Sequence, residues 1–394
     1  MTSPRLLHIK GSGGFGGDCV LMLELGRAAR EQGFDVDVLA TDPRFQDMVR
    51  SEGLGVVDLD VIRRAIRPVW DLRGLSRLTA YLSKSSYSIV HTHTSKPGIV
   101  GTLAARRAGV PAILHTVHLF PFHEETGRFL TSAYAAAVRL SARWCDRIVT
   151  VSDFQREWAL RQGIGRPEQI VSIPNGLPSE RVLPTRSKEQ IRNELGTRGA
   201  FVVLSTGRLA EQKGLEYLVL AAALLRSEVP GVKILLAGDG PLEAKLSKLV
   251  SDLRLEDTVL LLGFRADVGD LLAASDLVAL PSLWEGMSIS LLEAMAAGKP
   301  VVTTTLGSNR EVTQEGETAV LVPPKDPVSL ANAIRALASD PARLEELGRK
   351  GREVQSERYT MRRMVGTYLE EYDGLMRQKA LHALPQRVPV EGTL

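Results

Sequence analysis

Short apolar runs of β character alternate with helical stretches along most of this chain, and this alternation limits the folds available to it. Such runs lie at Leu6–Ile9, Phe34–Ala40 and Ser88–Thr92 in the first half, and at Phe201–Ser205 and Lys233–Ala237 in the second. A strand–helix–strand order predicts parallel sheets whose two faces are covered by helices. The chain has 394 residues, too many for one ordinary hydrophobic core. We therefore predict two α/β domains rather than a single sheet of very many strands.

Proline and glycine cluster in the segment Pro174–Pro178, and we place the domain boundary there. The first domain is expected over residues 1–178 and the second over residues 186–358. A long helical pattern follows and predicts a C-terminal helix over residues 359–380. The proline-containing tail, residues 384–394, is expected to be disordered.

Composition and charge exclude several classes of protein. The net charge of +3 gives no reason to expect a nucleic-acid partner. The 2 cysteines cannot form a disulfide framework and indicate a reducing compartment. The sequence has no apolar run long enough to span a membrane and no signal-peptide pattern at its start. We therefore expect a cytoplasmic protein.

A glycine-rich loop, Gly11–Gly16, lies between the first expected strand and the first expected helix. Its spacing matches G-x-G-x-x-G, a pattern that binds phosphate at the N-terminus of a helix. The acidic residue that a dinucleotide site requires comes somewhat late, at Asp42. Two interpretations stay open: a ligand-binding loop, and a tight glycine turn with a structural role only. In the first, the pair Gly16 and Gly17 lets the backbone approach a ligand closely.

Two cations, Arg208 and Lys213, lie in the loop after the first expected strand of the second domain. A diphosphate leaving group needs its charge neutralised, and arginine and lysine both supply positive charge to phosphate. The alternative is a pair of solvated surface cations. Open α/β sheets bind ligands at the carboxyl ends of their strands, so the position of this loop favours a phosphate site.

Two glutamates, Glu285 and Glu293, flank the start of an expected helix in the segment Pro281–Pro300. Gly286 allows a sharp turn, and Ser288 is expected to cap the helix. Both carboxylates can face one elongated ligand: Glu285 accepts hydrogen bonds from sugar hydroxyls and Glu293 from ribose hydroxyls. The alternative makes Glu285 a surface loop residue and Glu293 a solvated helix residue. The neighbours of Glu293 are apolar or small, so an isolated charge there needs a reason.

Backbone groups of the same segment complete this expected site. The amides of Met287 and Ser288 precede the first turn of the helix, where N–H groups lack partners within the helix. The positive end of the helix dipole also lies there. These amides are therefore expected to meet a phosphate of the ligand.

The two glutamates belong to the pattern Pro-Ser-x-x-Glu-Gly-x-x-x-x-x-Leu-Glu-Ala-Met-Ala-x-Gly-x-Pro-Val-Val, which starts at Pro281. This pattern resembles the signature of the retaining family-4 glycosyltransferases of the GT-B fold, also called glycosyl transferases group 1. Further segments that resemble this family are Gly16-Gly17, Ile173-Pro174-Asn175-Gly176, Gly207-Arg208…Lys213-Gly214, Gly238-Asp239-Gly240-Pro241 and Leu262-Gly263-Phe264. The resemblance spans the chain to about residue 375. It implies two Rossmann-like doubly wound domains facing across a cleft, with the C-terminal helix crossing back to the N-terminal domain.

The resemblance also implies roles for residues of the second domain. Arg208 and Lys213 would bind the donor diphosphate, Glu285 would position the transferred sugar, and Glu293 would bind the ribose. The donor site would also include Gly286, Met287 and Ser288. Arg208, Lys213 and Glu285 are thus the catalytic candidates of this domain.

Other matched positions imply contacts around the same donor. Gly263 and Phe264 would lie against the base, while Gly16 and Gly17 would approach the donor phosphates from the N-terminal domain. His118 matches the histidine that faces the sugar and is the fourth catalytic candidate. A satisfied core histidine is the alternative for His118. One departure is Cys19, which stands where the family often has Glu and bears on the acceptor more than on the donor.

The family reaction keeps the anomeric configuration and is thought to proceed on one face of the sugar. The leaving phosphate helps to deprotonate the acceptor, so no nucleophilic side chain is required. Arg208 and Lys213 can perform the electrostatic work of a metal, and we expect no metal and no other cofactor. A zinc site is the alternative for the clustered histidines, but no cysteine or glutamate stands around them at metal-ligand spacing. The clustered residues are His91, His93, His115, His118 and His123.

The sequence thus predicts a transferase that moves a hexose or N-acetylhexosamine from a UDP-sugar, or next a GDP-sugar, to a glycan or polyprenyl-linked acceptor of surface polysaccharide synthesis. The stretch Phe129–Trp144 mixes apolar residues and arginines. It is expected either to lie on an anionic membrane at its inner face or to be a plain surface helix. Two rival functions are an NAD(P)-dependent oxidoreductase that uses Gly11–Gly16 and a non-catalytic sugar-nucleotide-binding protein.

Overall fold

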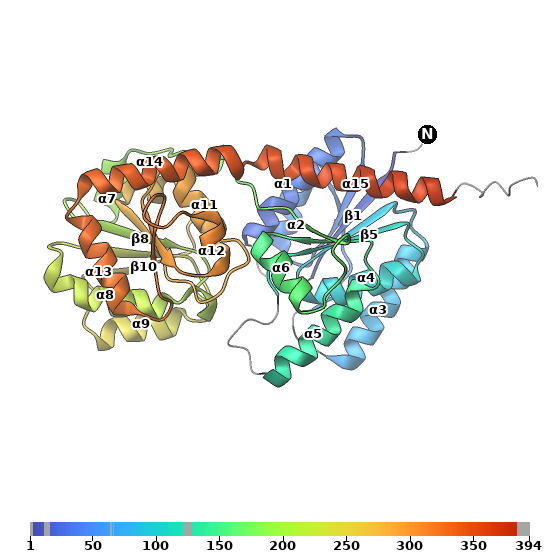
Figure 1. The fold of residues 1–394 in the computed structure, drawn as a ribbon, viewed down its shortest axis with the longest axis horizontal. Coiled ribbons are helices and arrows are strands. Elements are labelled where there is room, and N and C mark those ends of the chain that lie inside the picture. Colours follow the sequence, from blue (N-terminus) through green and yellow to red (C-terminus); the bar gives the residue numbers. More distant parts are fainter. Residues whose placement is uncertain (1–2, 12–15, 64, 66, 121–127, 384–394) are drawn as a thin grey trace, which may run out of the picture. The chain divides into compact units, whose positions relative to one another are not determined.

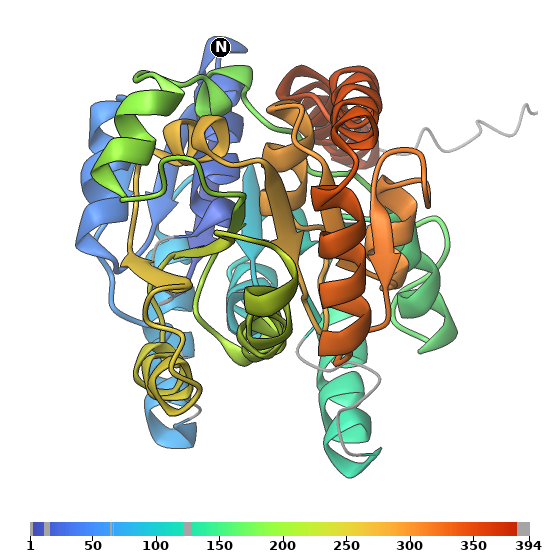
Figure 2. The ribbon, with the colours of Figure 1, turned by 90° about the vertical axis from the view of Figure 1, so that its left-hand side faces the viewer.

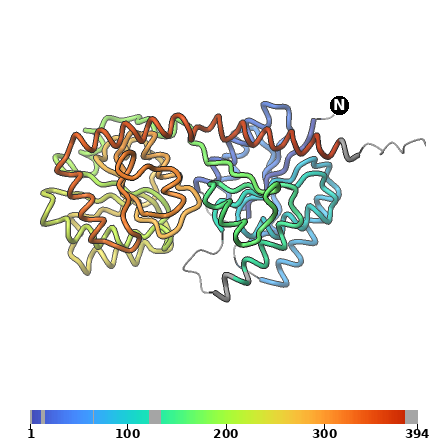
Figure 3. Tube along the Cα trace, viewed as in Figure 1, coloured from blue at the N-terminus to red at the C-terminus, as the bar shows by residue number. Residues whose placement is uncertain are grey.

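The computed structural model describes the chain except for residues 1–2, 12–15, 64, 66, 121–127 and 384–394. The expected tail, most of the glycine-rich loop and His123 therefore lie outside the described residues. The chain divides into two compact units (Figure 1). Unit 1 comprises Met1–Thr150, Trp158–Ile173 and Val365–Leu394, and unit 2 comprises Val151–Glu157 and Pro174–Met364. The units are interleaved in the chain, whose path can be followed in Figure 3.

Unit 1 contains a sheet of parallel strands in the order β3-β2-β1-β4-β5-β6-β7. Its strands are β1 (Arg5–Lys10), β2 (Asp35–Leu39), β3 (Gly55–Val57), β4 (Ile89–His93), β5 (Ala112–Val117), β6 (Arg147–Thr150) and β7 (Ile170–Ser172). The helices of this part of the chain are α1 (Gly17–Glu31), α2 (Pro43–Ser51), α3 (Pro68–Ser83), α4 (Ser95–Arg107), α5 (Arg128–Ala142), α6 (Asp153–Arg161) and α15 (Met361–Ala383).

Unit 2 contains a second parallel sheet, in the order β10-β9-β8-β11-β12-β13. Its strands are β8 (Val202–Thr206), β9 (Lys233–Ala237), β10 (Val259–Gly263), β11 (Leu277–Leu280), β12 (Val301–Thr304) and β13 (Val320–Val322). Its helices are η1 (Ser179–Val182), α7 (Lys188–Glu194), η2 (Glu211–Lys213), α8 (Leu215–Glu228), α9 (Glu243–Asp252), α10 (Val268–Ala274), α11 (Ile289–Ala296), α12 (Gly307–Val312), α13 (Pro327–Ala338) and α14 (Pro341–Arg358). Both strand orders follow the doubly wound pattern, so the predicted pair of Rossmann-like domains is confirmed.

The sheet of unit 2 is apolar on both faces. Successive side chains of a strand point to opposite faces. On β8, Val203 packs in one core cluster with α8, α9 and α13, while its neighbours Val202 and Leu204 pack in another with α7, α10 and α11. Helices surround this sheet in the views of Figures 1 and 2. This double cover explains why its strands read as continuous apolar runs in the sequence.

The sheet of unit 1 buries polar side chains among its apolar ones. Leu7 and Ile9 of β1 are fully buried in a cluster with residues of α3 and α4. The alternate residues of the same strand are Leu6, His8 and Lys10, which are also buried. The sheet therefore buries polar groups on its second face, and these groups need partners there.

Helix α15 supplies partners for these polar groups from Tyr368 and Tyr372. The hydroxyl of Tyr372 lies 2.6 Å from Nδ1 of His91, and the hydroxyl of Tyr368 lies 3.0 Å from Oγ1 of Thr116. An ion pair between Glu371 and Arg147, at 2.6 Å, adds a contact with β6. The prediction that the C-terminal helix packs on the N-terminal domain is therefore confirmed.

Candidate active site

The loop from β8 to α8 carries Lys213 and is shaped by two glycines. Gly207 has φ +135° and Gly214 has φ +59°, values that residues with a side chain rarely adopt. A Cβ atom on Gly214 would also lie 2.2 Å from the carbonyl oxygen of Pro281. The amide of Leu283 donates to the carbonyl of Gln212 at 2.7 Å. The loops that follow β8 and β11 are thus joined through their backbones.

Glu285 is held by three side chains at this junction. Its Oε1 lies 2.5 Å from Nζ of Lys213 and accepts from the hydroxyl of Ser282 at 3.0 Å. Its Oε2 accepts from Nε2 of Gln212 at 2.9 Å. The side chains of Lys213 and Glu285 are 16% and 6% exposed, so this is not a solvated surface pair. The carboxylate is fixed in orientation and has charge-assisted bonds to both oxygens.

Glu293, on α11, is buried and pairs with a residue that the sequence analysis did not select. Its Oε1 forms an ion pair with Nε of Arg181, on η1. Burial raises the pKa of Glu293, while the positive charges of Arg181 and Lys213 partly oppose this effect. The interpretation of Glu293 as a solvated helix residue is therefore wrong. Only its isolation among apolar neighbours hinted at a buried partner in the sequence.

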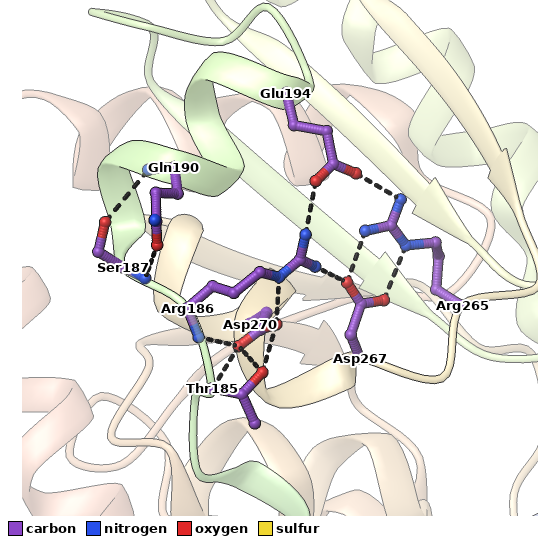
Figure 4. A network of polar contacts seen from close by, with 8 residues as sticks. All are labelled: Thr185, Arg186, Ser187, Gln190, Glu194, Arg265, Asp267 and Asp270. Atoms are coloured by element: carbon purple, nitrogen blue, oxygen red, sulfur yellow. Dashed lines mark hydrogen bonds and ion pairs between the residues drawn. The ribbon is translucent and has the colours of Figure 1, made fainter.

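The segment that carries Arg181 is fixed by a dense polar network farther along the chain (Figure 4). Asp270, on α10, accepts from the amides of Thr185 and Arg186 at 2.6 and 3.0 Å. Nε of Arg186 lies 2.8 Å from the same carboxylate. Burial opposes ionisation of Asp270, but the hydrogen bonds from Arg186 and Thr185 outweigh it and lower its pKa to about 2. The residues drawn are Thr185, Arg186, Ser187, Gln190, Glu194, Arg265, Asp267 and Asp270.

The remaining predicted donor residues of unit 2 lie around these loops. Arg208 is exposed, and no hydrogen bond or ion pair joins its side chain to any residue that the structure describes. Gly263 ends β10 with φ +64°, and the adjacent Phe264 is 50% exposed. The prediction that Ser288 caps α11 is confirmed, because its hydroxyl accepts from the amide of Leu291 at 3.4 Å.

Gly286 and Met287 complete the loop that precedes α11, and both are buried. The carbonyl of Met287 accepts from Nδ2 of Asn175 at 3.3 Å. Within unit 2 the structure therefore places Gly286, Met287, Ser288 and Glu285 on one connection, beside Lys213. Their roles in binding a donor stay predictions.

A second group of polar residues lies at the carboxyl ends of the strands of unit 1. His118 directly follows β5 and is half-buried, and its Nε2 lies 3.2 Å from Nδ1 of His93. Gly16 is the N-cap of α1 and Gly17 is its first residue. Burial lowers the pKa of His118, while the nearby carboxylate of Asp18 acts in the opposite direction.

Lys10 is a buried cation of the same group that the sequence analysis missed. It ends β1, and its Nζ lies 3.0 Å from the carboxylate of Asp18 and 2.5 Å from Sγ of Cys19. Burial would lower the pKa of Lys10, but Asp18 and Cys19 outweigh this and raise it. The available signal was a lysine that ends an apolar strand, followed by an aspartate in the first turn of the next helix.

Three buried histidines, His8, His91 and His93, have ring nitrogens within 4.8 Å of one another and could in principle hold a metal ion. Hydrogen bonds already engage most of these nitrogens. Both nitrogens of His91 are bonded, to Tyr372 at 2.6 Å and to Thr116 at 2.7 Å. These bonds account for the cluster without a metal, and the absence of a metal cofactor stays a prediction.

Over the described ranges, none of the helices has both the length and the apolar character that a bilayer span requires.

Family models match both halves of the chain. Residues 17–176 match the model described as glycosyl transferase 4-like domain, and residues 187–354 match the model described as glycosyl transferases group 1. The two matches together cover the elements that carry all the candidate residues of the site except Gly16.

Full-length relatives agree with these matches. The chain is 34% identical over 312 residues to the Escherichia coli UDP-Gal:alpha-D-GlcNAc-diphosphoundecaprenol alpha-1,3-galactosyltransferase, covering 78% of this chain and 81% of that protein. It is 32% identical over 374 residues to D-inositol 3-phosphate glycosyltransferase 1 of Catenulispora acidiphila, with 88% of each chain covered.

Solved structures agree on the fold. The crystal structure of Anabaena HepE in complex with UDP and glucose superposes with a TM-score of 0.83 at 24% identity, covering 94% of this chain and 100% of that one. The paired Rossmann-like units and the loops described above define a glycosyltransferase of the GT-B fold. The family models and the relatives together show that the chain belongs to the family-4 glycosyltransferases, which are also called glycosyl transferases group 1. The rival prediction of an oxidoreductase is not supported.

Proposed function

We propose that this enzyme transfers a hexose or N-acetylhexosamine from a UDP-sugar to a lipid-linked glycan acceptor, with retention of the anomeric configuration and without a metal ion. GDP-sugars are the second choice of donor. The observation that carries the proposal is the contact of Lys213 with Glu285 at 2.5 Å, buried beside the start of α11. Lysine is a residue type that binds phosphate, and a carboxylate such as that of Glu285 can accept hydrogen bonds from a sugar.

The charges of unit 2 fit a pyrophosphate donor. Arg208 is exposed, with a guanidinium that can take a phosphate in a bidentate manner. Lys213 is partly buried, where its charge is less screened than in water. Together they would stabilise the negative charge that develops on the leaving diphosphate. This is the contribution that a divalent metal makes in other transferases.

The environment of Glu285 argues against a nucleophilic role for this residue. Lys213, Ser282 and Gln212 bond to its oxygens and fix them in place. Hydrogen bonds to an ionised carboxylate stabilise its negative charge and so reduce its nucleophilicity, while a remaining lone pair can still accept from a hydroxyl group. Deprotonation of the acceptor by the leaving phosphate then needs no further base, which is consistent with retention on one face of the sugar.

The acceptor is proposed from the relatives. The E. coli relative is named for transfer of galactose to a GlcNAc-diphosphoundecaprenol, and this name suggests UDP-galactose and a polyprenyl-diphosphate-linked sugar as first substrates. Exposed apolar side chains on unit 1 would suit a peripheral contact at the inner face of an anionic membrane. These are Val69 and Leu72 of α3, at 66% and 67% exposed, and Leu140 of α5, at 47%, next to the exposed Arg139.

A donor and acceptor panel tests this proposal. UDP-galactose, UDP-glucose, UDP-N-acetylglucosamine and GDP-mannose are each incubated with a short-chain lipid diphosphate that carries α-GlcNAc, with and without EDTA. We expect transfer from one of the UDP-sugars, an α-linked product by NMR and no effect of EDTA. Transfer with inversion, or activity that needs an added metal, would contradict the corresponding part of the proposal.

Two variants test the roles assigned to the site. Lys213→Ala and Glu285→Ala are expected to abolish transfer while the fold is kept, as judged by circular dichroism. Lys245→Ala is a matched control, because Lys245 is an exposed lysine of the same unit, 63% exposed, paired with Glu216. Near-normal turnover in both site variants would refute these roles.

A further inference from the structure

Three histidines of unit 1 form a row of hydrogen-bonded rings that runs across three neighbouring strands. His8 lies on β1, His93 on β4 and His118 directly after β5. Nδ1 of His8 lies 2.9 Å from Nε2 of His93, and Nδ1 of His93 lies 3.2 Å from Nε2 of His118. The last two rings are stacked, with centroids 5.5 Å apart and planes inclined by 23°. We call His8, His93 and His118 the histidine row.

The two ends of the row differ. At the inner end, Nε2 of His8 is buried and has no hydrogen-bond partner among the described residues. At the outer end, His118 is half-buried and its Nδ1 makes no hydrogen bond within the described part of the chain. A ligand can therefore reach only the outer end of the row.

Hydrogen bonds within the row couple the tautomers of its rings. A neutral imidazole has one N–H donor and one acceptor nitrogen. If each neutral ring donates to the next, the N–H groups along the whole row point in one direction. Either the free Nδ1 of His118 carries a proton and Nε2 of His8 is an unpaired lone pair, or the reverse holds. Nε2 of His8 is buried with no partner among the described residues, and a buried N–H group without an acceptor is rare in proteins, which favours a lone pair on His8 and the N–H at the outer end.

We propose that the histidine row fixes His118 as the neutral tautomer with its proton on Nδ1, so that His118 is a permanent hydrogen-bond donor and does not become a cation. His8 and His93 are positioning residues in this arrangement. The Nδ1–H group would donate to a hydroxyl of the transferred sugar, and this use of the group rests on the proposed function. The state of the ring does not rest on it. An uncharged donor suits this place, because positive charge develops on the sugar as its bond to phosphate breaks.

The row restrains protonation because His93 donates to Nε2 of His118. His118 can become a cation only if Nε2 accepts a proton, and His93 must then give up the tautomer in which it donates to that nitrogen. The other groups that face His118 act in both directions: the charge of Lys10 opposes protonation and Asp18 promotes it. The buried rings of His8, His91, His93 and His115 have pKa values lowered by burial, and the hydroxyls of Tyr368 and Tyr372 have raised pKa values, so all of these groups are neutral near pH 7.

A matched pair of variants at His93 tests the inference by kinetics. In His93→Asn the amide nitrogen takes the place of Nδ1 and can still donate to His118. In His93→Gln the amide takes the place of Nε2, so the bond to His118 is lost while contact with His8 is kept. We expect kcat/KM to be flat between pH 5.5 and 8 in the wild type and in His93→Asn. In His93→Gln it should fall towards low pH, by up to about tenfold at pH 5.5 if His118 regains an ordinary pKa. A flat profile in His93→Gln, or the same acid limb in both variants, would overturn the proposal.

A spectroscopic experiment on the wild-type chain is independent of turnover and of variant folding. Long-range ¹H–¹⁵N spectra of protein labelled with ¹⁵N-histidine report which ring nitrogen carries the proton, and His118→Asn identifies the signal. We expect His118 protonated on Nδ1 from pH 5.5 to 8. A proton on Nε2, or a cationic ring above pH 6, would contradict the inference even if the enzyme were active. Absence of transfer with the expected tautomer would instead contradict the proposed function alone.

Discussion

The sheets of the two units share a strand order but differ on their second faces. In unit 2 both faces are apolar, and the polar residues that matter lie in loops beyond the strands, paired as charges such as Lys213 with Glu285. In unit 1 the sheet itself buries polar residues, among them histidines that are bonded to one another and to α15 and whose pKa values are lowered by burial. The comparison teaches that one sheet topology can carry functional residues in two ways. In unit 2 charged residues lie in loops beyond an apolar core, and in unit 1 buried imidazoles belong to the core itself.

The largest expected effect is a difference in kcat/KM between a variant of Glu285 and a variant of His118. Glu285→Gln keeps the shape of the side chain but removes its charge, and we expect kcat/KM to fall by about 10²–10³-fold. His118→Asn keeps a donor near the place of Nδ1 and is expected to lose only about tenfold. Steady-state kinetics with the preferred donor measures both. Equal losses in the two variants would remove the distinction between the sites.

The second effect concerns the buried ion pair of unit 2. Arg181→Ala leaves the carboxylate of Glu293 buried without its partner, and we expect a loss of about 2–3 kcal/mol in the free energy of unfolding at pH 8. The pKa of Glu293 is already raised by burial, so protonation at lower pH removes the unpaired charge and the loss should shrink towards pH 5.

Urea unfolding at the two pH values measures this change. Arg349→Ala is the control, because Arg349 and its partner Glu353 are 59% and 56% exposed, and its effect should stay within about 0.5 kcal/mol. A loss in Arg181→Ala that is the same at pH 5 and pH 8 would contradict the expected protonation of the unpaired Glu293 between these two values.

The third effect concerns the acid stability of unit 1 and is the smallest per pH unit. Burial lowers the pKa of His8 to about 3, below the value of about 6.5 for an unfolded chain. As the pH falls through this window the unfolded state gains a proton that the folded state does not bind, so stability is lost. Each such histidine contributes about 1.4 kcal/mol per pH unit.

His8→Phe removes one of these groups, and the slope of unfolding free energy against pH between about 6 and 4 should fall by that amount. The slope is the measured quantity, because the substitution also changes packing and the absolute stability. An unchanged slope would mean that His8 is protonated in the folded protein.

The sequence was sufficient to predict the fold class and the capping of α11 by Ser288. These features depend on local spacing, which a single chain displays directly. The roles of the residues in the loops that follow β8 and β11 stay predictions. The sequence analysis missed Arg181, Gln212 and Lys10. Their hydrogen-bond partners lie on other elements and come close only when the elements pack together. The sequence separation of His8 and His93 is 85 residues, and only the placement of β1 beside β4 brings them together.

The contacts of α15 have a practical consequence for the study of unit 1 in isolation. A fragment that stops before Tyr368 would leave His91 and Thr116 with empty hydrogen-bonding positions in the middle of the sheet. The final helix is therefore a structural part of unit 1, although the segment Pro174–Met364, nearly half of the chain, separates it from the rest of that unit. Adding it back as a synthetic peptide should rescue the truncated fragment, and this complementation would make the recombined half accessible to labelling one histidine at a time.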